Sequence, residues 1–189
     1  RIAEVLLDHP PVNAFDSAGW HHLAKTITAL GHDDGVSVIV LAAEGRGYCA
    51  GVDIKELARD SRLITQVNKG CYDSFAAIHD CPVPVIAAAH GFVLGGGIGL
   101  VGSCDVILAS DDATFGLPEI DRGALGAASH LLRMFPIQKV RRMLYTGEPI
   151  TAAEAYRLGA LEAVVPRAEL RAAAHALAAT IAAKSPRAL

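Results

Sequence analysis

The sequence predicts an α/β fold with mostly parallel sheets. Strand-like and helix-like segments alternate along the chain, the strands are apolar enough for burial on both faces, and capping residues and glycines mark helix ends. The chain has 189 residues, of which 52% are hydrophobic and 20% charged. Since we find no repeat or break in composition, we expect one domain over residues 1–189.

The N-terminal segments predict a βαβ unit. Residues 2–8 are expected to form a strand, and Asp16 or Ser17 can cap a helix that ends at Gly31. Residues 36–42 are β-branched and apolar, as in a strand buried on both faces. The apolar residues of the helix recur at helical spacing: Trp20, Leu23, Ile27 and Leu30.

The next helices are marked by their first residues. Segments 53–56 and 151–154 each resemble a capping box, with Asp53 or Thr151 as the cap and a glutamate three residues later. A further helix is expected over residues 62–79. The remaining expected elements are strands over 83–89, 105–110 and 161–165, and an alanine-rich helix over 167–184.

Charge and cysteine usage narrow the class of protein. The net charge is −3 with both signs interspersed, which predicts neither a nucleic-acid partner nor a membrane anchor. The four cysteines form no C-x-x-C pair, so we expect reduced thiols, no metal site and a cytoplasmic location. Segment 83–102 has no charged residue, but Pro84 and six glycines would break a membrane-spanning helix.

Two glycine-containing segments carry the predicted chemistry. Residues 47–56 read GYCAGVDIKE, and residues 83–100 read VPVIAAAHGFVLGGGIGL, with Cys104-Asp105 following. Each places glycine where a strand turns into a helix, and such turns leave backbone N–H groups without partners. Two of these turns together could form an oxyanion hole.

These segments resemble the crotonase (enoyl-CoA hydratase/isomerase) superfamily, and Phe115-Gly-Leu-Pro-Glu119 is similar to its F-G-x-P-E motif. The resemblance implies a crotonase-like ββα-superhelix (spiral) fold with C-terminal helices, of which the final ones are expected to lie beyond residue 189. It also implies a homo-oligomer, a trimer or hexamer. The substrate would be an acyl-CoA thioester, with coenzyme A as part of the substrate and no tightly bound cofactor.

The resemblance assigns roles to individual residues. It implies oxyanion-hole amides at Ala50 and Gly96 and an acid/base at Glu119, whose apolar neighbours would raise its pKa. It also implies that coenzyme A lies along one short segment, with its phosphates near a lysine. That segment contains Ala50, Val52, Asp53, Ile54 and Lys55.

One departure from the family pattern decides the predicted reaction. Hydratases of the family carry a first glutamate where this chain has Gly99, so a reaction with a single base is favoured. The chain most resembles an actinobacterial branch that opens carbocyclic ketone rings in steroid breakdown, while isomerisation of a double bond is also open. Asp121 or His130 could help Glu119 to activate water.

Three alternatives stay open at this point. The first is a conventional enoyl-CoA hydratase. The second is a catalytically idle acyl-CoA-binding or structural subunit, which would be favoured because position 99 is glycine and not glutamate. The third is a dinucleotide site, because residues 97–102 match G-x-G-x-x-G and Glu119 stands near the offset of a ribose ligand. Only the acyl-CoA interpretations predict binding of coenzyme A.

Overall fold

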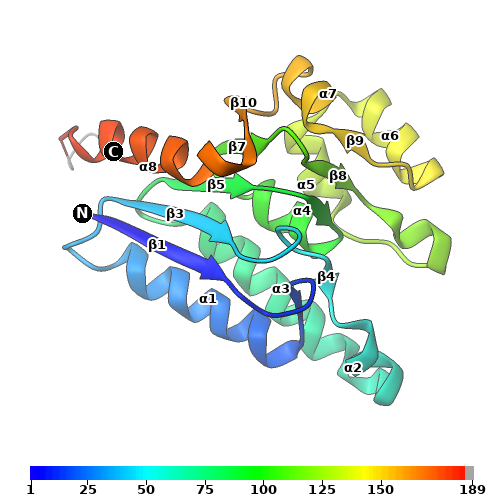
Figure 1. Cartoon of the computed structure of the whole chain (residues 1–189). Coiled ribbons are helices and arrows are strands. Elements are labelled where there is room, and N and C mark those ends of the chain that lie inside the picture. Colours follow the sequence, from blue (N-terminus) through cyan, green and yellow to red (C-terminus); the bar gives the residue numbers. More distant parts are fainter. Residues whose placement is uncertain (186–189) are drawn as a thin grey trace.

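The computed structural model describes residues 1–185, and a five-stranded sheet forms its centre (Figure 1). All neighbouring strands of this sheet run parallel, as the sequence predicts. The strand order β1-β3-β5-β7-β10 follows the chain, so each connection crosses from one strand to its neighbour. The strands are β1 (Ile2–Leu7), β3 (Val38–Ala43), β5 (Val85–Ala89), β7 (Val106–Ser110) and β10 (Ala163–Val165).

The two faces of this sheet bury different helices. In β3, Val38 and Val40 belong to the apolar cluster that includes Ala174 of α8 (Leu170–Ala182). The intervening residues, Ile39 and Leu41, belong to the larger cluster on the opposite face. Since successive strand residues point to opposite faces, an uninterrupted apolar strand is needed to fill both layers.

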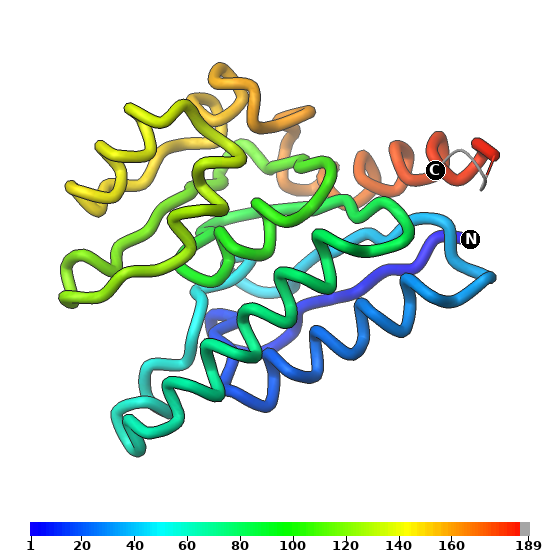
Figure 2. The backbone as a smooth tube through the Cα atoms, turned by 180° about the vertical axis from the view of Figure 1, so that it is seen from behind, coloured from blue at the N-terminus to red at the C-terminus, as the bar shows by residue number. Residues whose placement is uncertain are grey.

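The larger cluster is covered by α1 (Ser17–Gly31) and α3 (Ile64–His79), which pack side by side (Figure 2). They approach closely because Gly70 lies against Trp20, where a Cβ atom would be 2.8 Å from the tryptophan Cβ. The Ser74 hydroxyl donates to the Trp20 carbonyl oxygen at 2.7 Å and fixes this contact.

Two smaller sheets, which the sequence patterns do not predict, lie beside the central sheet. One pairs β2 (Ala14–Phe15) with β4 (Gly51–Val52), and the other contains β6 (Phe92–Leu94), β8 (Thr114–Gly116) and β9 (Ile150–Thr151). Their strands have two or three residues, too few to show an alternating pattern. The other helices are α2 (Ile54–Arg59), α4 (Gly96–Val101), α5 (Ala128–Met134), α6 (Ile137–Thr146) and α7 (Ala152–Arg157), with 3-10 turns at Ser61–Leu63, Pro118–Arg122 and Arg167–Glu169.

One sequence expectation is wrong in detail, and one alternative is excluded. Asp53 does cap α2, accepting from the Lys55 amide, but Glu56 does not complete a capping box and instead accepts from the Ser17 amide at 2.9 Å. The alternative of a dinucleotide site at residues 97–102 is excluded, because Gly97 lies inside α4 and not in the turn between a strand and the helix. The uncharged segment 83–102 divides into β5, β6 and α4, and no helix among residues 1–185 is long and apolar enough to cross a membrane.

Candidate active site

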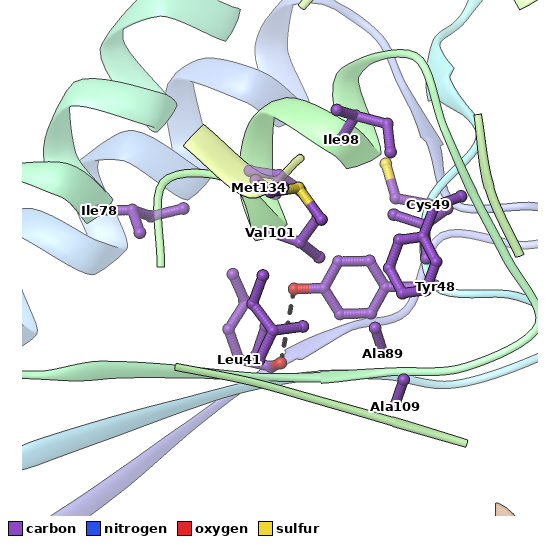
Figure 3. Close-up of a cluster of buried hydrophobic side chains, with 14 of the residues drawn as sticks. Leu41, Tyr48, Cys49, Ile78, Ala89, Ile98, Val101, Ala109 and Met134 are labelled. Carbon is purple, nitrogen blue, oxygen red and sulfur yellow. Dashed lines mark hydrogen bonds between the residues drawn. The ribbon is translucent and has the colours of Figure 1, made fainter. Parts of the chain in front are cut away.

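The turn after β3 is held in place by a buried side chain and by hydrogen bonds to two neighbouring strands. Tyr48 is fully buried and its hydroxyl donates to the Leu41 carbonyl oxygen at 3.5 Å (Figure 3). The Cys49 carbonyl oxygen accepts from the Leu94 amide at 2.9 Å. Gly51 has a φ of +91°, a conformation that favours glycine. The chain is therefore held in one path as it leaves the core for α2.

The start of α4 lies directly against this turn. Gly95 precedes the helix with a φ of +56°, and no side chain caps the first amides. Such first-turn amides have no acceptor within the helix, so the Gly96 N–H is available to a ligand oxygen. A Cβ atom added to Gly51 would lie 2.8 Å from the Gly96 nitrogen. The two predicted turns thus come together as expected.

The expectation for Ala50 does not hold in this geometry. Its amide donates to the Val12 carbonyl oxygen at 3.1 Å and is therefore already paired within the protein. The next amide, that of Gly51, donates to Cys49 Sγ at 3.3 Å, and sulfur is a weak acceptor. A first oxyanion donor from this turn would have to come from the Gly51–Val52 segment, one or two residues later than the sequence motif implies.

The Glu119 carboxyl group lies against Gly95, the residue that precedes α4 in the second of these turns. Glu119 lies in the 3-10 turn after β8, and the Gly95 amide, just before α4, donates to the Gly116 carbonyl oxygen at the end of β8. Cβ atoms added to Gly95 and Gly126 would be 3.0 and 2.6 Å from Glu119 Oε1. Two glycines therefore make room for the carboxyl group.

The environment of Glu119 suits proton transfer. Burial raises its pKa above the ordinary value of 4.5. Its Oε2 atom is buried and has no hydrogen-bond partner within residues 1–185. Since buried polar atoms in proteins are nearly always paired, this oxygen is placed to meet a water molecule or substrate.

His130 belongs to a short hydrogen-bond chain with Ser103 and Gly99. The Ser103 Oγ atom lies 2.8 Å from the Gly99 carbonyl oxygen and 3.2 Å from His130 Nδ1, so the neutral tautomer with its proton on Nδ1 satisfies both contacts. Burial lowers the pKa of His130 to about 4, and Arg133 adds to this effect. The imidazole is therefore neutral near pH 7.

The side chain of Asp121 has different neighbours from that of Glu119. Its side chain is exposed and lies against Gly147, where an added Cβ atom would be 3.1 Å from Asp121 Oδ2. Glu119, two residues earlier, lies against Gly95 and Gly126 instead. The two carboxylates thus face different neighbours, and the predicted cooperation of Asp121 with Glu119 finds no support in this geometry.

The segment predicted to contact coenzyme A leads from the paired turns to the surface. Val52 and Asp53 are half-buried, whereas Ile54 and Lys55 in the first turn of α2 are exposed. A long ligand whose reactive end lay at Gly96 could follow this segment outward. Within residues 1–185 we find no cluster of histidine, cysteine or acidic side chains suited to a metal ion.

Comparison with known proteins identifies the family to which the chain belongs. The sequence profile described as enoyl-CoA hydratase/isomerase matches residues 1–189. The chain belongs to this family. The protein is thus an acyl-CoA enzyme of the crotonase superfamily, as the motifs around Gly51, Gly96 and Glu119 imply.

Two relatives in this family carry the same specific name. The (7aS)-7a-methyl-1,5-dioxo-2,3,5,6,7,7a-hexahydro-1H-indene-carboxyl-CoA hydrolase of Rhodococcus jostii is 51% identical over 188 residues, which cover 98% of this chain and 73% of the relative. The protein of that name from Mycobacterium tuberculosis is 50% identical and is covered over 76% of its length.

Solved structures of the family have the same fold. Human enoyl-coenzyme A hydratase domain-containing protein 3 matches with a TM-score of 0.92 and 34% identity, over 98% of this chain and 76% of that chain. An enoyl-CoA hydratase of Mycobacterium smegmatis matches with a TM-score of 0.89 and 32% identity, over 97% and 74%. The predicted crotonase-like fold is confirmed.

Sequence reasoning missed three residues that shape the site. Trp20 and Phe75 pack against Gly96 and Gly99, and Gly126 makes room for the Glu119 carboxyl group. Trp20 and Phe75 fit the apolar stripes of α1 and α3 and gave no separate signal. Gly126 stands in a segment without a motif.

Proposed function

We propose that this enzyme hydrolyses a carbon–carbon bond in the ring of a cyclic-ketone acyl-CoA thioester. The observation that carries the proposal is the Glu119 carboxyl group, which is half-buried, unpaired at Oε2 within residues 1–185, and packed against Gly95 at the start of the second glycine turn. The names of the two hydrolases at 50% and 51% identity support this reaction over simple hydration.

Glu119 would act first as a base. It takes a proton from water, whose oxygen adds to the ring ketone carbon. The bond between this carbon and its ring neighbour then breaks, and the electron pair remains on the neighbour as a carbanion, stabilised by the thioester or a nearby carbonyl group. Protonated Glu119 returns its proton to that carbon. The products balance as one opened ring with one new carboxylate and its proton.

The two turns would stabilise the negative charge. The Gly96 amide supplies one donor and the Gly51–Val52 segment the other, both from backbone that is rigidly held. Preorganised donors of this kind lower the barrier by roughly 3 kcal/mol each in a site shielded from water. His130, neutral near pH 7, is a second candidate base for the attacking water.

The test uses the bicyclic diketone carboxyl-CoA thioester named for the two relatives, with full-length enzyme. We expect a product that has gained one water and contains a new carboxylic acid, detected by mass spectrometry after esterification. Gain of water without a new acid would indicate hydration. No conversion, with coenzyme A binding intact, would contradict the proposal.

Double-bond isomerisation is the second candidate, because Glu119 alone could remove a proton from one carbon and deliver it to another. Conversion of a 3-enoyl thioester to its 2-enoyl isomer without change of mass would identify it.

We also propose that coenzyme A follows segment 50–55, and that the enzyme is a cytoplasmic trimer or hexamer. Sedimentation of the full-length protein as a monomer would contradict that assembly.

A further inference from the structure

Three glycines at positions 96, 99 and 102 are spaced one helical turn apart, and an aromatic residue fills the space beside each. A Cβ atom would meet the Trp20 ring at Gly96, the Phe75 ring at Gly99, and the Cβ atom of His130 at Gly102. The ring centroids of Trp20 and Phe75 are 5.8 Å apart, and those of Phe75 and His130 are 4.8 Å apart. Trp20, Phe75 and His130 therefore pack in one row along this face of the helix.

Phe75 forms the closest of these contacts. A Cβ atom at Gly99 would lie 2.5 Å from both Cε1 and Cε2 of the ring, and closer still to Cζ. Phe75 cannot easily turn aside, because Trp20 and His130 meet it edge to face at 80° and 67°. Any side chain at position 99 is therefore excluded while Phe75 stays in place.

Position 99 matters because it follows Gly96 by one turn of the same helix. A side chain there would project along the face that begins at the Gly96 amide, a proposed donor to the thioester oxygen. Hydration of a 2-enoyl thioester adds the oxygen of water to the β-carbon and a proton to the α-carbon. A second carboxylate beside this amide could hold that water while Glu119 transfers the proton.

We propose that Phe75 is a specificity-determining residue. By filling the space over Gly99, its ring excludes the water that hydration would need at this position and any group that could hold it, so Glu119 is the one carboxylate proposed to act on the substrate. This inference rests on the proposed function and deepens it: the Phe75 ring on α3, together with the missing carboxylate at Gly99, disfavours hydration relative to other enolate chemistry.

The experiment compares two double variants, Phe75→Ala with Gly99→Glu and Phe75→Ala with Gly99→Gln. Both remove the ring and add side chains of nearly equal size, so only the carboxylate differs. We expect the glutamate variant to hydrate a short trans-2-enoyl-CoA about 100-fold faster than the glutamine variant and the unmodified enzyme. Equal hydration rates in two folded variants that bind coenzyme A would overturn the proposal.

A single variant decides the question if the double variants do not fold. Phe75→Ala leaves a cavity over Gly99 that formate, a small carboxylate, can enter. We expect hydration by this variant to rise with formate concentration, while the unmodified enzyme shows no response. A rate independent of formate would count against the role of Phe75. Ring opening by the unmodified enzyme, measured in parallel, tests the proposed function separately.

Discussion

The indole ring of Trp20 lies against the Cα atom of Gly96, so closely that a Cβ atom there would be 2.7 Å from Cζ2 and 2.8 Å from Cη2. Trp20 is fully buried and is fixed by α3 through the Ser74 hydroxyl. The position of the proposed oxyanion donor therefore depends on a ring from α1. Glycine is needed at position 96 because the ring already occupies the space of a side chain.

Replacement of Gly96 by alanine should consequently displace the first turn of α4. Since the Trp20 ring is fully buried and packs edge-on against Phe15 and Phe75, we expect the Gly96 amide to shift away from the substrate oxygen. Loss of one such donor predicts a fall in kcat of about 100-fold, with a smaller change in the affinity for coenzyme A. Steady-state kinetics and calorimetric binding of coenzyme A measure the two effects.

Gly35→Ala provides the matched control. Gly35 is exposed, and the nearest atom to its added Cβ would be an oxygen of the Asp33 side chain at 3.0 Å, in a loop on the surface. This variant should keep its kcat within about twofold, as surface substitutions usually do. Equal losses in both variants would show that the effect at Gly96 is not specific to the donor.

Glu119→Gln should remove the proton acceptor while keeping the size of the side chain. We expect kcat to fall by about 10²–10⁴-fold with coenzyme A binding retained. The glutamine cannot take a proton from water or return one to carbon, so both proton transfers fail. Turnover at the original rate would exclude Glu119 as the base.

The same substitution should alter how stability depends on pH. Because the folded state raises the pKa of Glu119 above 4.5, the unmodified protein loses stability as pH rises from that value through the folded-state pKa. Glutamine has no charge to bury. The midpoint of urea unfolding for Glu119→Gln, relative to the unmodified protein, should therefore increase between pH 4 and pH 8. A constant difference across this range would show that Glu119 is not desolvated.

The sequence predicts the central sheet well and the smaller sheets poorly, for a physical reason. Strands such as β3 are buried on both faces, so their composition alone reveals them. β4 has two residues, Gly51 and Val52, and forms only because Phe15 of β2 lies alongside. Such a strand depends on partners distant in the sequence, which no local pattern can specify.

The same distinction applies to the site. The glycine turns and Glu119 were predictable because their motifs are local, whereas the pairing of the Ala50 amide with Val12 depends on a loop that passes beside the turn. The packing of Phe75 over Gly99 joins residues of α3 and α4 and is likewise non-local. The sequence shows that position 99 has no side chain, but it does not show that the Phe75 ring fills the space beside it.

The variants His130→Asn and Asp121→Asn test which of these two residues assists Glu119 in activating water. Asparagine at position 130 retains a donor for Ser103 but has no basic nitrogen, so kcat should fall by about 100-fold if His130 activates water. Asp121 lies against Gly147, and its variant should stay within about twofold. Unchanged turnover in His130→Asn, combined with loss in Glu119→Gln, would assign the base to Glu119 alone.

His130 should also make the protein sensitive to acid. Its folded-state pKa is about 4, below the ordinary 6.5, so the unfolded chain binds a proton more readily between these values. Stability should therefore decline as pH falls from 6.5 towards 4, by about 1–2 kcal/mol after allowance for the solvent that reaches this half-buried ring. Urea unfolding at several pH values measures the decline, and His130→Asn should make it smaller. An identical decline in that variant would assign the acid sensitivity to other groups.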